Sequence, residues 1–169
     1  VKVLSFSENY GFAEGYNKAI KQTQYKYTIL LNSDVEVTED WTRPLLDFMR
    51  RNSDVGALQP KIRSWKERTK FEYAGAAGGY LDKLGYPYCR GRLFDSIEED
   101  HGQYDGKAVA ICWASGAALM VRTDIYLKVG GLDARFFAHM EEIDLCWRLR
   151  SRGKQLVCIP QSVVYHVGV

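Results

Sequence analysis

Two patterns of apolar residues alternate along this chain, one typical of β-strands and the other typical of α-helices. Tyr27–Leu31 and Val55–Ile62 are short apolar runs that predict buried strands. Between these runs, residues 41–52 place apolar side chains three and four positions apart, which predicts an amphipathic helix, and residues 12–20 repeat that spacing. Strands that alternate with helices favour an α/β sheet with crossover connections.

The pattern changes after the second strand. Residues 63–106 mix glycine, tyrosine and charged residues, which predicts loops and short strands in a substrate-facing insert. Val1–Phe6 alternates as a strand would, and because the chain does not open on methionine we expect a domain that is incomplete at its N-terminus. The remaining predictions are strands at 109–113, 117–121, 156–159 and 163–165, a short helix after Thr123 and a helix from Glu141 to Arg152.

Length, charge and cysteine usage narrow the class of protein. A chain of 169 residues, 46% of them hydrophobic, can bury one sizeable core, so residues 1–169 are predicted to form one domain. The net charge of +2 is too small to indicate the basic surface of a nucleic-acid binder. Four widely spaced cysteines without a CxxC pair argue against a zinc cluster or a disulfide framework and favour a cytosolic setting. The sequence contains no apolar run of the roughly 20 residues that a membrane span needs.

The polar segment Asn32-Ser33-Asp34 follows a predicted buried strand. Open α/β sheets bind ligands at the carboxyl ends of their strands, so a carboxylate there can hold a hard divalent cation such as Mg²⁺ or Mn²⁺. The alternative is a structural turn, because Asn, Ser and Asp are common turn formers. A second weak signal is Asn9-Tyr10-Gly11 before the first helix, where backbone N–H groups can face a phosphate.

A second acidic cluster opens the helix predicted from Glu141. Glu141 and Glu142 lie where the helix dipole favours carboxylates, and Asp144 is placed to pair with Arg148 one turn later. One of these acids can instead act as a general base in a cleft, and spacing alone does not choose among them. His166 follows an apolar run, and a lone histidine at a strand end is more often structural than a ligand.

Taken in order, five segments of the chain resemble family 2 glycosyltransferases, especially bacterial rhamnosyltransferase-like members. They are NYGFAEGYNKAI, TILLNSDVEV, SGAALMVR, GGLDARFFAHMEEIDLCWRLRSRG and VVYHVG. The resemblance spans nearly the whole chain and implies a GT-A fold, which is Rossmann-like with a mixed, mainly parallel sheet flanked by helices. The same resemblance implies an inverting transfer from a nucleotide-sugar donor to a glycan or lipid-linked acceptor. It also implies that the family's first strand and nucleotide-base loop are missing here.

The resemblance assigns the donor side of the site. Asn32-Ser33-Asp34 is similar to the family's DxD signature with Asn32 in place of the first acid, which implies that Asp34 binds Mg²⁺ or Mn²⁺ and the donor diphosphate. His166 corresponds to the histidine that completes the metal site in some relatives. The other donor-binding positions implied by the resemblance are Asn9, Gly11, Phe12, Asn32, Ser33, Ser115, Gly116 and Ala117.

The acceptor side rests on the paired acids. Glu141-Glu142 matches the family's Glu-Asp pair, so Glu142 stands where the catalytic base is expected, and Glu141 and Asp144 are alternatives. Glutamate reaches one methylene further than aspartate, so the cleft must take up that difference if Glu142 is the base.

Two other functions are compatible with the same residues. One is a nucleotidyltransferase that makes sugar nucleotides, and the other is a non-catalytic carbohydrate-binding module, which the tyrosine-rich insert favours. The resemblance suggests rhamnose from a thymidine donor and a cytoplasmic enzyme, with peripheral association at the inner membrane left open. The sequence does not determine the sugar, the acceptor or the oligomeric state.

Overall fold

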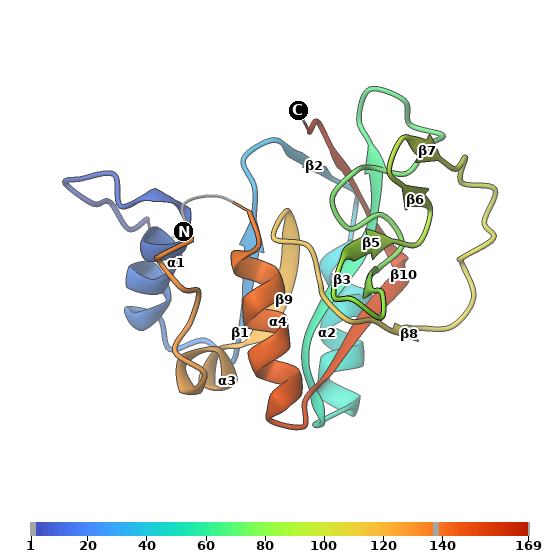
Figure 1. Cartoon of the computed structure of the whole chain (residues 1–169). Helices are drawn as coiled ribbons and strands as arrows, with labels where there is room; N and C mark the ends of the chain where they lie inside the picture. The colour runs from blue at the N-terminus through green and yellow to red at the C-terminus, as the bar shows by residue number, and fades with distance from the viewer. Residues whose placement is uncertain (1–2, 137–138, 169) are drawn as a thin grey trace.

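A computed structural model describes residues 3–136 and 139–168 of the chain. Helices and strands follow the predicted order with two differences, because the short strand Val35–Val37 was not predicted and the strand predicted at 109–113 covers only Val109–Ala110. A separate small sheet lies beside the main one (Figure 1). The elements are α1 (Gly11–Lys21), β1 (Tyr27–Leu31), β2 (Val35–Val37), α2 (Thr42–Arg51), β3 (Val55–Ser64), β4 (Gly79–Leu81), β5 (Pro87–Cys89), β6 (Arg92–Leu93), β7 (Ser96–Ile97), β8 (Val109–Ala110), β9 (Ala118–Arg122), α3 (Thr123–Lys128), α4 (Glu141–Ser151) and β10 (Gln155–His166).

The central sheet is mixed and flanked by helices, which confirms the predicted α/β class, but fewer of its strand pairs are parallel than expected. Its order is β1-β9-β3-β10-β2, with β8 also paired to β10. Strands β1, β3 and β10 run in one direction, but β9 lies between β1 and β3 and is antiparallel to both. Among the described residues only β3 and β10 form a parallel pair, so the sheet is not mainly parallel. A fully buried strand such as β9 has the same apolar composition in either direction, so its sequence did not reveal its orientation.

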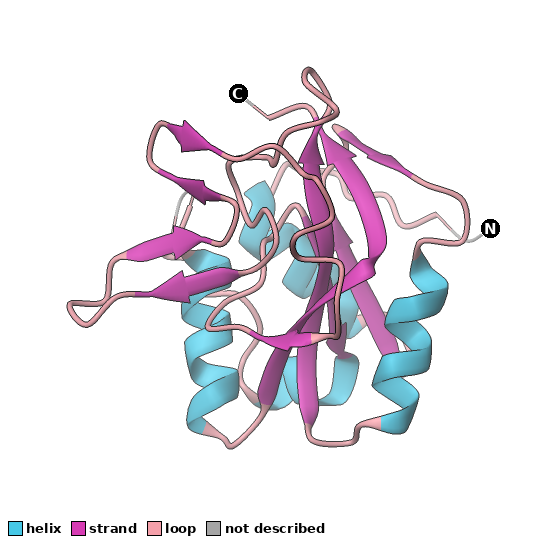
Figure 2. Cartoon of the chain, turned by 90° about the vertical axis from the view of Figure 1, so that its right-hand side faces the viewer, coloured by secondary structure: helices cyan, strands magenta, loops and turns pink. Residues whose placement is uncertain are grey.

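Helices cover both faces of this sheet. Figures 1 and 2 show α4 on one side of the strands and α2 on the other. Because successive side chains of a strand point to opposite faces, neighbours such as Ala57 and Leu58 of β3 enter different cores. Ala57 shares its core with Leu145 of α4 and Tyr126 of α3, whereas Leu58 packs with Leu45 of α2. Burial of one such leucine contributes roughly 2 kcal/mol.

The insert between β3 and β8 folds as a second sheet, in agreement with the predicted short strands. Its order is β4-β5-β6-β7, and it lies beside the upper half of the central sheet (Figure 2). A buried ion pair ties the insert to β3, because Lys61 Nζ lies 2.7 Å from the Asp100 carboxylate and also contacts Asp105. The insert is therefore anchored to β3, in the middle of the central sheet.

Two strand predictions need correction. The strands predicted at 156–159 and 163–165 are one strand, β10, which stays paired with β3 across an irregularity between Ile159 and Val163. Residues 1 and 2 of the predicted first strand lie outside the described residues, and Val3–Phe6 form no strand in the part of the chain that the structure describes. An alternating segment needs a neighbouring strand to complete its hydrogen bonds, and Val3 is exposed.

The four cysteines are free thiols. Cys89, Cys146 and Cys158 are buried, and burial raises their pKa values to about 11, 12 and 12, respectively. These thiols are therefore protonated members of the core at neutral pH. Among residues 3–136 and 139–168, the structure contains no helix that is both long and apolar enough to span a membrane.

Asn17 joins α1 to the loop that follows α3. Its Oδ1 accepts hydrogen bonds from the Tyr126 hydroxyl (2.6 Å) and the Leu132 backbone N–H (3.0 Å), and its Nδ2 donates to the Leu132 carbonyl (2.7 Å). A side chain at position 131 would collide with this amide, so Gly131, with φ at +72°, lets the loop close over it. Asn17 thus satisfies three polar groups in the core.

Asn17→Ala is expected to lower the free energy of unfolding by about 2–3 kcal/mol, because it leaves buried hydrogen-bonding groups unpaired. Urea unfolding followed by circular dichroism measures this change. Lys18→Ala removes a partly exposed side chain from the same helix and is the matched control, with an expected loss below about 0.5 kcal/mol. Equal stabilities of the two variants would show that Asn17 does not anchor α1.

Candidate active site

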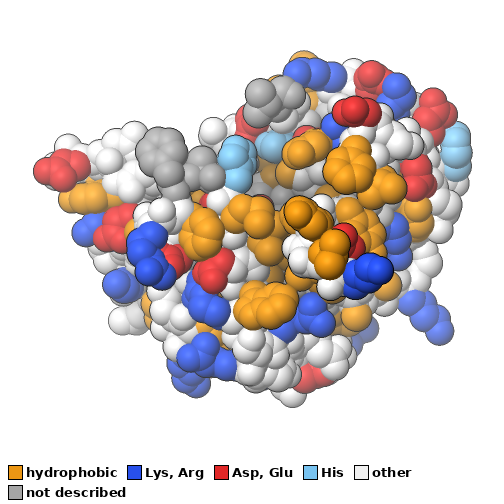
Figure 3. Space-filling view, in the orientation of Figure 1, with side chains coloured by type: hydrophobic (Ala, Val, Ile, Leu, Met, Phe, Trp, Pro, Cys, Tyr) orange, Lys and Arg blue, Asp and Glu red, His pale blue; other side chains and the backbone are white. Residues whose placement is uncertain are grey.

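A cleft of about 690 Å³ opens where β1, β3 and β10 end. Figure 3 shows the molecule hollowed along its upper rim, where histidine side chains gather. Segments from both ends of the chain and from the insert contribute to its walls. The lining residues are Phe12, Asn32, Asp34, Ser64, Lys66, Glu67, Lys70, Phe71, Glu72, Tyr73, Ala74, Arg92, Ile97, Ser115, Gly116, Ala117, His139, Glu141, Glu142, His166, Val167 and Gly168.

Asp34 and His166 meet at the edge of the sheet. Asp34 lies in the turn between β1 and β2, and β2 pairs antiparallel with the end of β10, opposite His166. The Val167 N–H donates to the Asp34 carbonyl (3.1 Å), which holds the two segments together. As a result, His166 Nε2 lies 3.3 Å from Asp34 Oδ1, although the two residues are separated by 132 positions in the sequence (166 minus 34).

A second carboxylate lies behind this histidine. Glu72 follows β3 and is buried, and its Oε2 lies 3.3 Å from His166 Nδ1 without the alignment of a good hydrogen bond. Glu72, and to a smaller extent Asp34, raise the pKa of His166 above its usual value, against the effect of burial. Burial raises the pKa of Glu72, but contacts with His166 and the Ala74 N–H outweigh burial and lower it.

The paired acids open α4, as the sequence predicts. His139 and Met140 have φ angles of +68° and +74°, a left-handed entry that turns the chain sharply into the helix. Burial raises the pKa of Glu142, and the neighbouring Glu141 adds to the effect. Glu142 Oε2 is buried and has no hydrogen-bond partner among the described residues. Such a carboxylate is a strong proton acceptor once it is charged.

The segment Ser115-Gly116-Ala117 forms the floor between the two acidic groups. The Ser115 N–H donates to Gln59 Oε1 (2.9 Å), and the Asn32 N–H donates to the Ala117 carbonyl (3.0 Å), so the segment is fixed to β3 and β1. A Cβ atom placed on Gly116 would lie 3.7 Å from Glu142 Cβ. A methyl group at position 116 would therefore reach van der Waals contact with Glu142.

The structure brings most of the predicted site residues to this cleft, but not all. Asp144 is not among the lining residues and instead pairs with Arg148, at 2.5 Å, on the flank of α4, so it is poorly placed as an alternative base. Asn9 and Gly11 form a local turn in which the Gly11 N–H donates to Asn9 Oδ1 (2.9 Å), and neither residue lines the cleft. Ser33 is also absent from its walls.

Sequence reasoning missed the contribution of the insert. Glu72, Lys66, Lys70 and Arg92 line the cleft, and the Arg92 guanidinium lies 4.3 Å from the centre of the Tyr73 ring. The sequence signal was the mixture of charged and aromatic residues in an insert of unusual length, which indicated a functional loop without identifying its members.

The side chains that could act as metal ligands suit a hard or borderline divalent cation. A carboxylate and an imidazole nitrogen converge from Asp34 and His166, and this pair of ligands is acceptable to Mn²⁺ and less typical of Mg²⁺. The described residues contain no group of three or more Asp, Glu, His or Cys side chains arranged to hold a metal ion. The protein can therefore supply part of a coordination sphere, and substrate phosphates and water would have to complete it.

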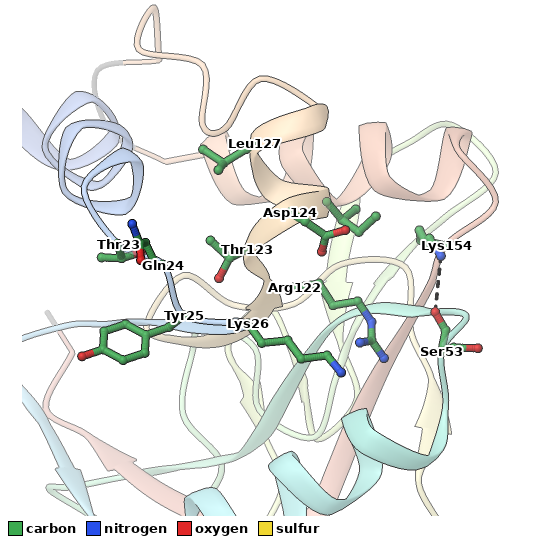
Figure 4. Close-up of a pocket in the computed structure, with 11 residues that line it drawn as sticks. Thr23, Gln24, Tyr25, Lys26, Ser53, Arg122, Thr123, Asp124, Leu127 and Lys154 are labelled. Atoms are coloured by element: carbon green, nitrogen blue, oxygen red, sulfur yellow. Dashed lines mark hydrogen bonds between the residues drawn. The ribbon is translucent and has the colours of Figure 1, made fainter.

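A second hollow of about 510 Å³ lies at the opposite end of the same strands (Figure 4). Lys26 precedes β1, and Arg122 ends β9. The Arg122 guanidinium is already committed to the carbonyls of Met49, Asn52 and Val55, at 2.6–2.7 Å. The residues that line this hollow include no paired carboxylates, so the first cleft is the better candidate for an active site.

The comparison with solved structures defines the class of fold. The chain superposes on the crystal structure of GalNAc-T7 with UDP, GalNAc and Mn²⁺ with a TM-score of 0.73 and 14% sequence identity, covering 98% of this chain and 32% of that one. The mixed sheet, with its acidic cleft at the strand ends, is thus the GT-A glycosyltransferase fold.

The chain belongs to glycosyl transferase family 2, whose sequence profile matches residues 1–121. It is 28% identical to N-acetylglucosaminyl-diphospho-decaprenol L-rhamnosyltransferase of Mycobacterium tuberculosis, over 98% of this chain and 58% of the relative. It is 35% identical to rhamnosyltransferase WbbL of Escherichia coli K12, over 93% of this chain and 61% of that protein. The chain therefore spans about three fifths of the length of these relatives.

Proposed function

We propose that this chain is the catalytic part of a glycosyltransferase that moves a sugar, with inversion, from a nucleotide-diphosphate donor to an acceptor hydroxyl. The observation that carries the proposal is the shared cleft, in which Asp34 and His166 meet at one wall and the buried Glu142 carboxylate lies at another. The names of the rhamnosyltransferase relatives favour a deoxyhexose donor and a lipid-linked acceptor. A cytoplasmic location beside the inner membrane agrees with an acceptor of that kind.

The protein groups divide the work of a direct displacement. Glu142 accepts the proton of the acceptor hydroxyl as that oxygen attacks the anomeric carbon, and the bond from this carbon to the diphosphate breaks on the opposite side. Asp34 and His166 would hold a divalent cation, which supplies positive charge to the departing diphosphate when it is bound. Gly116, which has no side chain, lines the cleft beside Phe12 and Glu142.

The reaction type is tested by product analysis. The protein is incubated with Mn²⁺, single sugar nucleotides including a thymidine-linked rhamnose, and a lipid-linked N-acetylhexosamine acceptor. We expect release of nucleoside diphosphate and, by NMR, a glycosidic linkage of inverted anomeric configuration. In a parallel incubation with a nucleoside triphosphate and a sugar 1-phosphate, release of pyrophosphate would instead identify a nucleotidyltransferase. Glycan binding without metal or nucleotide, and without turnover, would identify a binding module.

Gly116→Ala tests whether the floor limits the room for substrate. The new methyl group would lie 3.6 Å from Phe12 and 3.7 Å from Glu142, which is ordinary van der Waals contact, so the free energy of unfolding should change by less than about 0.5 kcal/mol. We expect kcat/KM to fall at least about tenfold, because a methyl group in a binding pocket is worth roughly 1–3 kcal/mol.

Gly106→Ala is the matched control for this variant, because a Cβ atom there meets no atom within 4 Å and position 106 does not line the cleft. Its steady-state kinetics should equal those of the unmodified protein. Unchanged kinetics in Gly116→Ala as well would show that the substrate does not use this floor.

A further inference from the structure

We propose that Glu72 is a positioning residue, which fixes the His166 imidazole so that Nε2 faces Asp34 and the cation. The inference rests on the proposed function, since it assigns a purpose to the histidine of that metal site. Its basis is the order of the three side chains: the imidazole lies between two carboxylates, with Asp34 at Nε2 and Glu72 at Nδ1, each at 3.3 Å.

The two carboxylates differ in exposure. The Asp34 side chain is 45% exposed and faces the open cleft, whereas the Glu72 side chain is only 8% exposed. A carboxylate at the solvent side can exchange water for a cation and a phosphate. A buried carboxylate on the far side of the ring contacts the other nitrogen and is better suited to orient the ligand than to replace it.

Glu72 is itself held rigidly. Its backbone N–H donates to the Ile62 carbonyl of β3 (3.2 Å), and its carboxylate accepts the Ala74 N–H (2.6 Å). Gly168, with φ at +64°, passes so close that a Cβ atom there would lie 2.7 Å from Glu72 Oε1. The residues after His166 therefore close over Glu72, and only glycine permits this approach.

The position of the proton on the His166 imidazole decides which ring nitrogen can bind a metal ion. A neutral histidine carries its proton on one nitrogen, and a carboxylate beside Nδ1 keeps the proton there. The lone pair of Nε2 is then free for a metal ion. Partners of this kind in the outer shell of metal sites typically change metal affinity 10–100-fold when they are removed.

Two variants of Glu72 separate charge from hydrogen bonding. Glu72→Gln keeps the shape of the side chain and an oxygen that can accept from Nδ1–H, whereas Glu72→Ala removes both. Glu98→Gln is the matched control, because Glu98 belongs to the same insert but does not line the cleft, and its carboxylate accepts hydrogen bonds from Gln103 and Tyr104. Mn²⁺ binding is measured by electron paramagnetic resonance with Mn²⁺ alone, with thymidine diphosphate and with uridine diphosphate. Thermal unfolding identifies any variant that has lost its fold.

We expect the dissociation constant of Mn²⁺ to rise about tenfold or more in Glu72→Ala, less in Glu72→Gln, and not at all in Glu98→Gln. In ¹⁵N NMR spectra of the metal-free protein, recorded at a pH where the imidazole is neutral, His166 should carry its proton on Nδ1, and this preference should weaken in Glu72→Ala. Unchanged Mn²⁺ affinity in folded Glu72 variants would overturn the inference while leaving the proposed function intact.

One further result would count against the proposed metal-dependent function and not only against the role of Glu72. Failure of the unmodified protein to bind Mn²⁺ with either nucleotide would remove the metal-dependent function, and with it the purpose assigned to Glu72. The NMR spectra are decisive for the positioning role itself, because a His166 protonated only on Nε2 would show that Glu72 does not orient the ring.

Discussion

Glu142→Gln is expected to abolish sugar transfer while donor binding persists. The amide has nearly the shape of the carboxylate but cannot accept the acceptor's proton, so the rate should fall by about 10²–10⁴-fold. Turnover is measured by release of nucleoside diphosphate, and donor binding by isothermal titration calorimetry. Asp144→Asn should retain activity, because Asp144 pairs with Arg148 and does not line the cleft. Loss of activity in Glu141→Gln together with full activity in Glu142→Gln would transfer the role of base to Glu141.

The same substitution should stabilise the protein at neutral pH. Burial raises the pKa of Glu142 in the folded state above its unfolded value, so the folded state prefers the protonated carboxyl. The stabilising effect is present below the unfolded pKa, near 4.3, and is lost as pH rises through the folded pKa. Gln, which never ionises, avoids that loss. Urea unfolding at pH 4 and pH 7.5 should show a gain for Glu142→Gln only at the higher pH, and equal stabilities at pH 7.5 would contradict the burial argument.

Asp34→Asn is expected to lower transfer about 10²-fold or more and to weaken Mn²⁺ binding, with little effect on folding. The Asp34 side chain is 45% exposed, so the fold does not depend on its charge, whereas an amide is a poor ligand for a divalent cation. Removal of metal from the unmodified protein by a chelator should cause a similar loss, reversible with Mn²⁺. Glu36→Gln is the control, since Glu36 lies two positions away and pairs with Arg68 on the surface. Full activity in the presence of chelator would show that transfer needs no metal.

Local patterns were sufficient for most of the secondary structure. The apolar run Tyr27–Leu31 and the helical stripes of α2 and α4 were predicted close to their observed limits, because side-chain periodicity is set by backbone geometry over a few residues. The same patterns did not reveal the direction of β9 or the continuity of β10, since both depend on which strand lies alongside.

The sequence by itself determined the alternation of helices and strands, the acids at Asp34 and at Glu141-Glu142, and a family resemblance carried by the order of the motifs. Only the tertiary structure decided that Asp34, His166 and Glu142 share a cleft from which Asp144 is absent, and that Glu72 lies behind the histidine. The physical reason is distance along the chain. Spacing predicts neighbours within one helix or strand, whereas contacts across a sheet depend on strand order and on burial, which no local segment encodes.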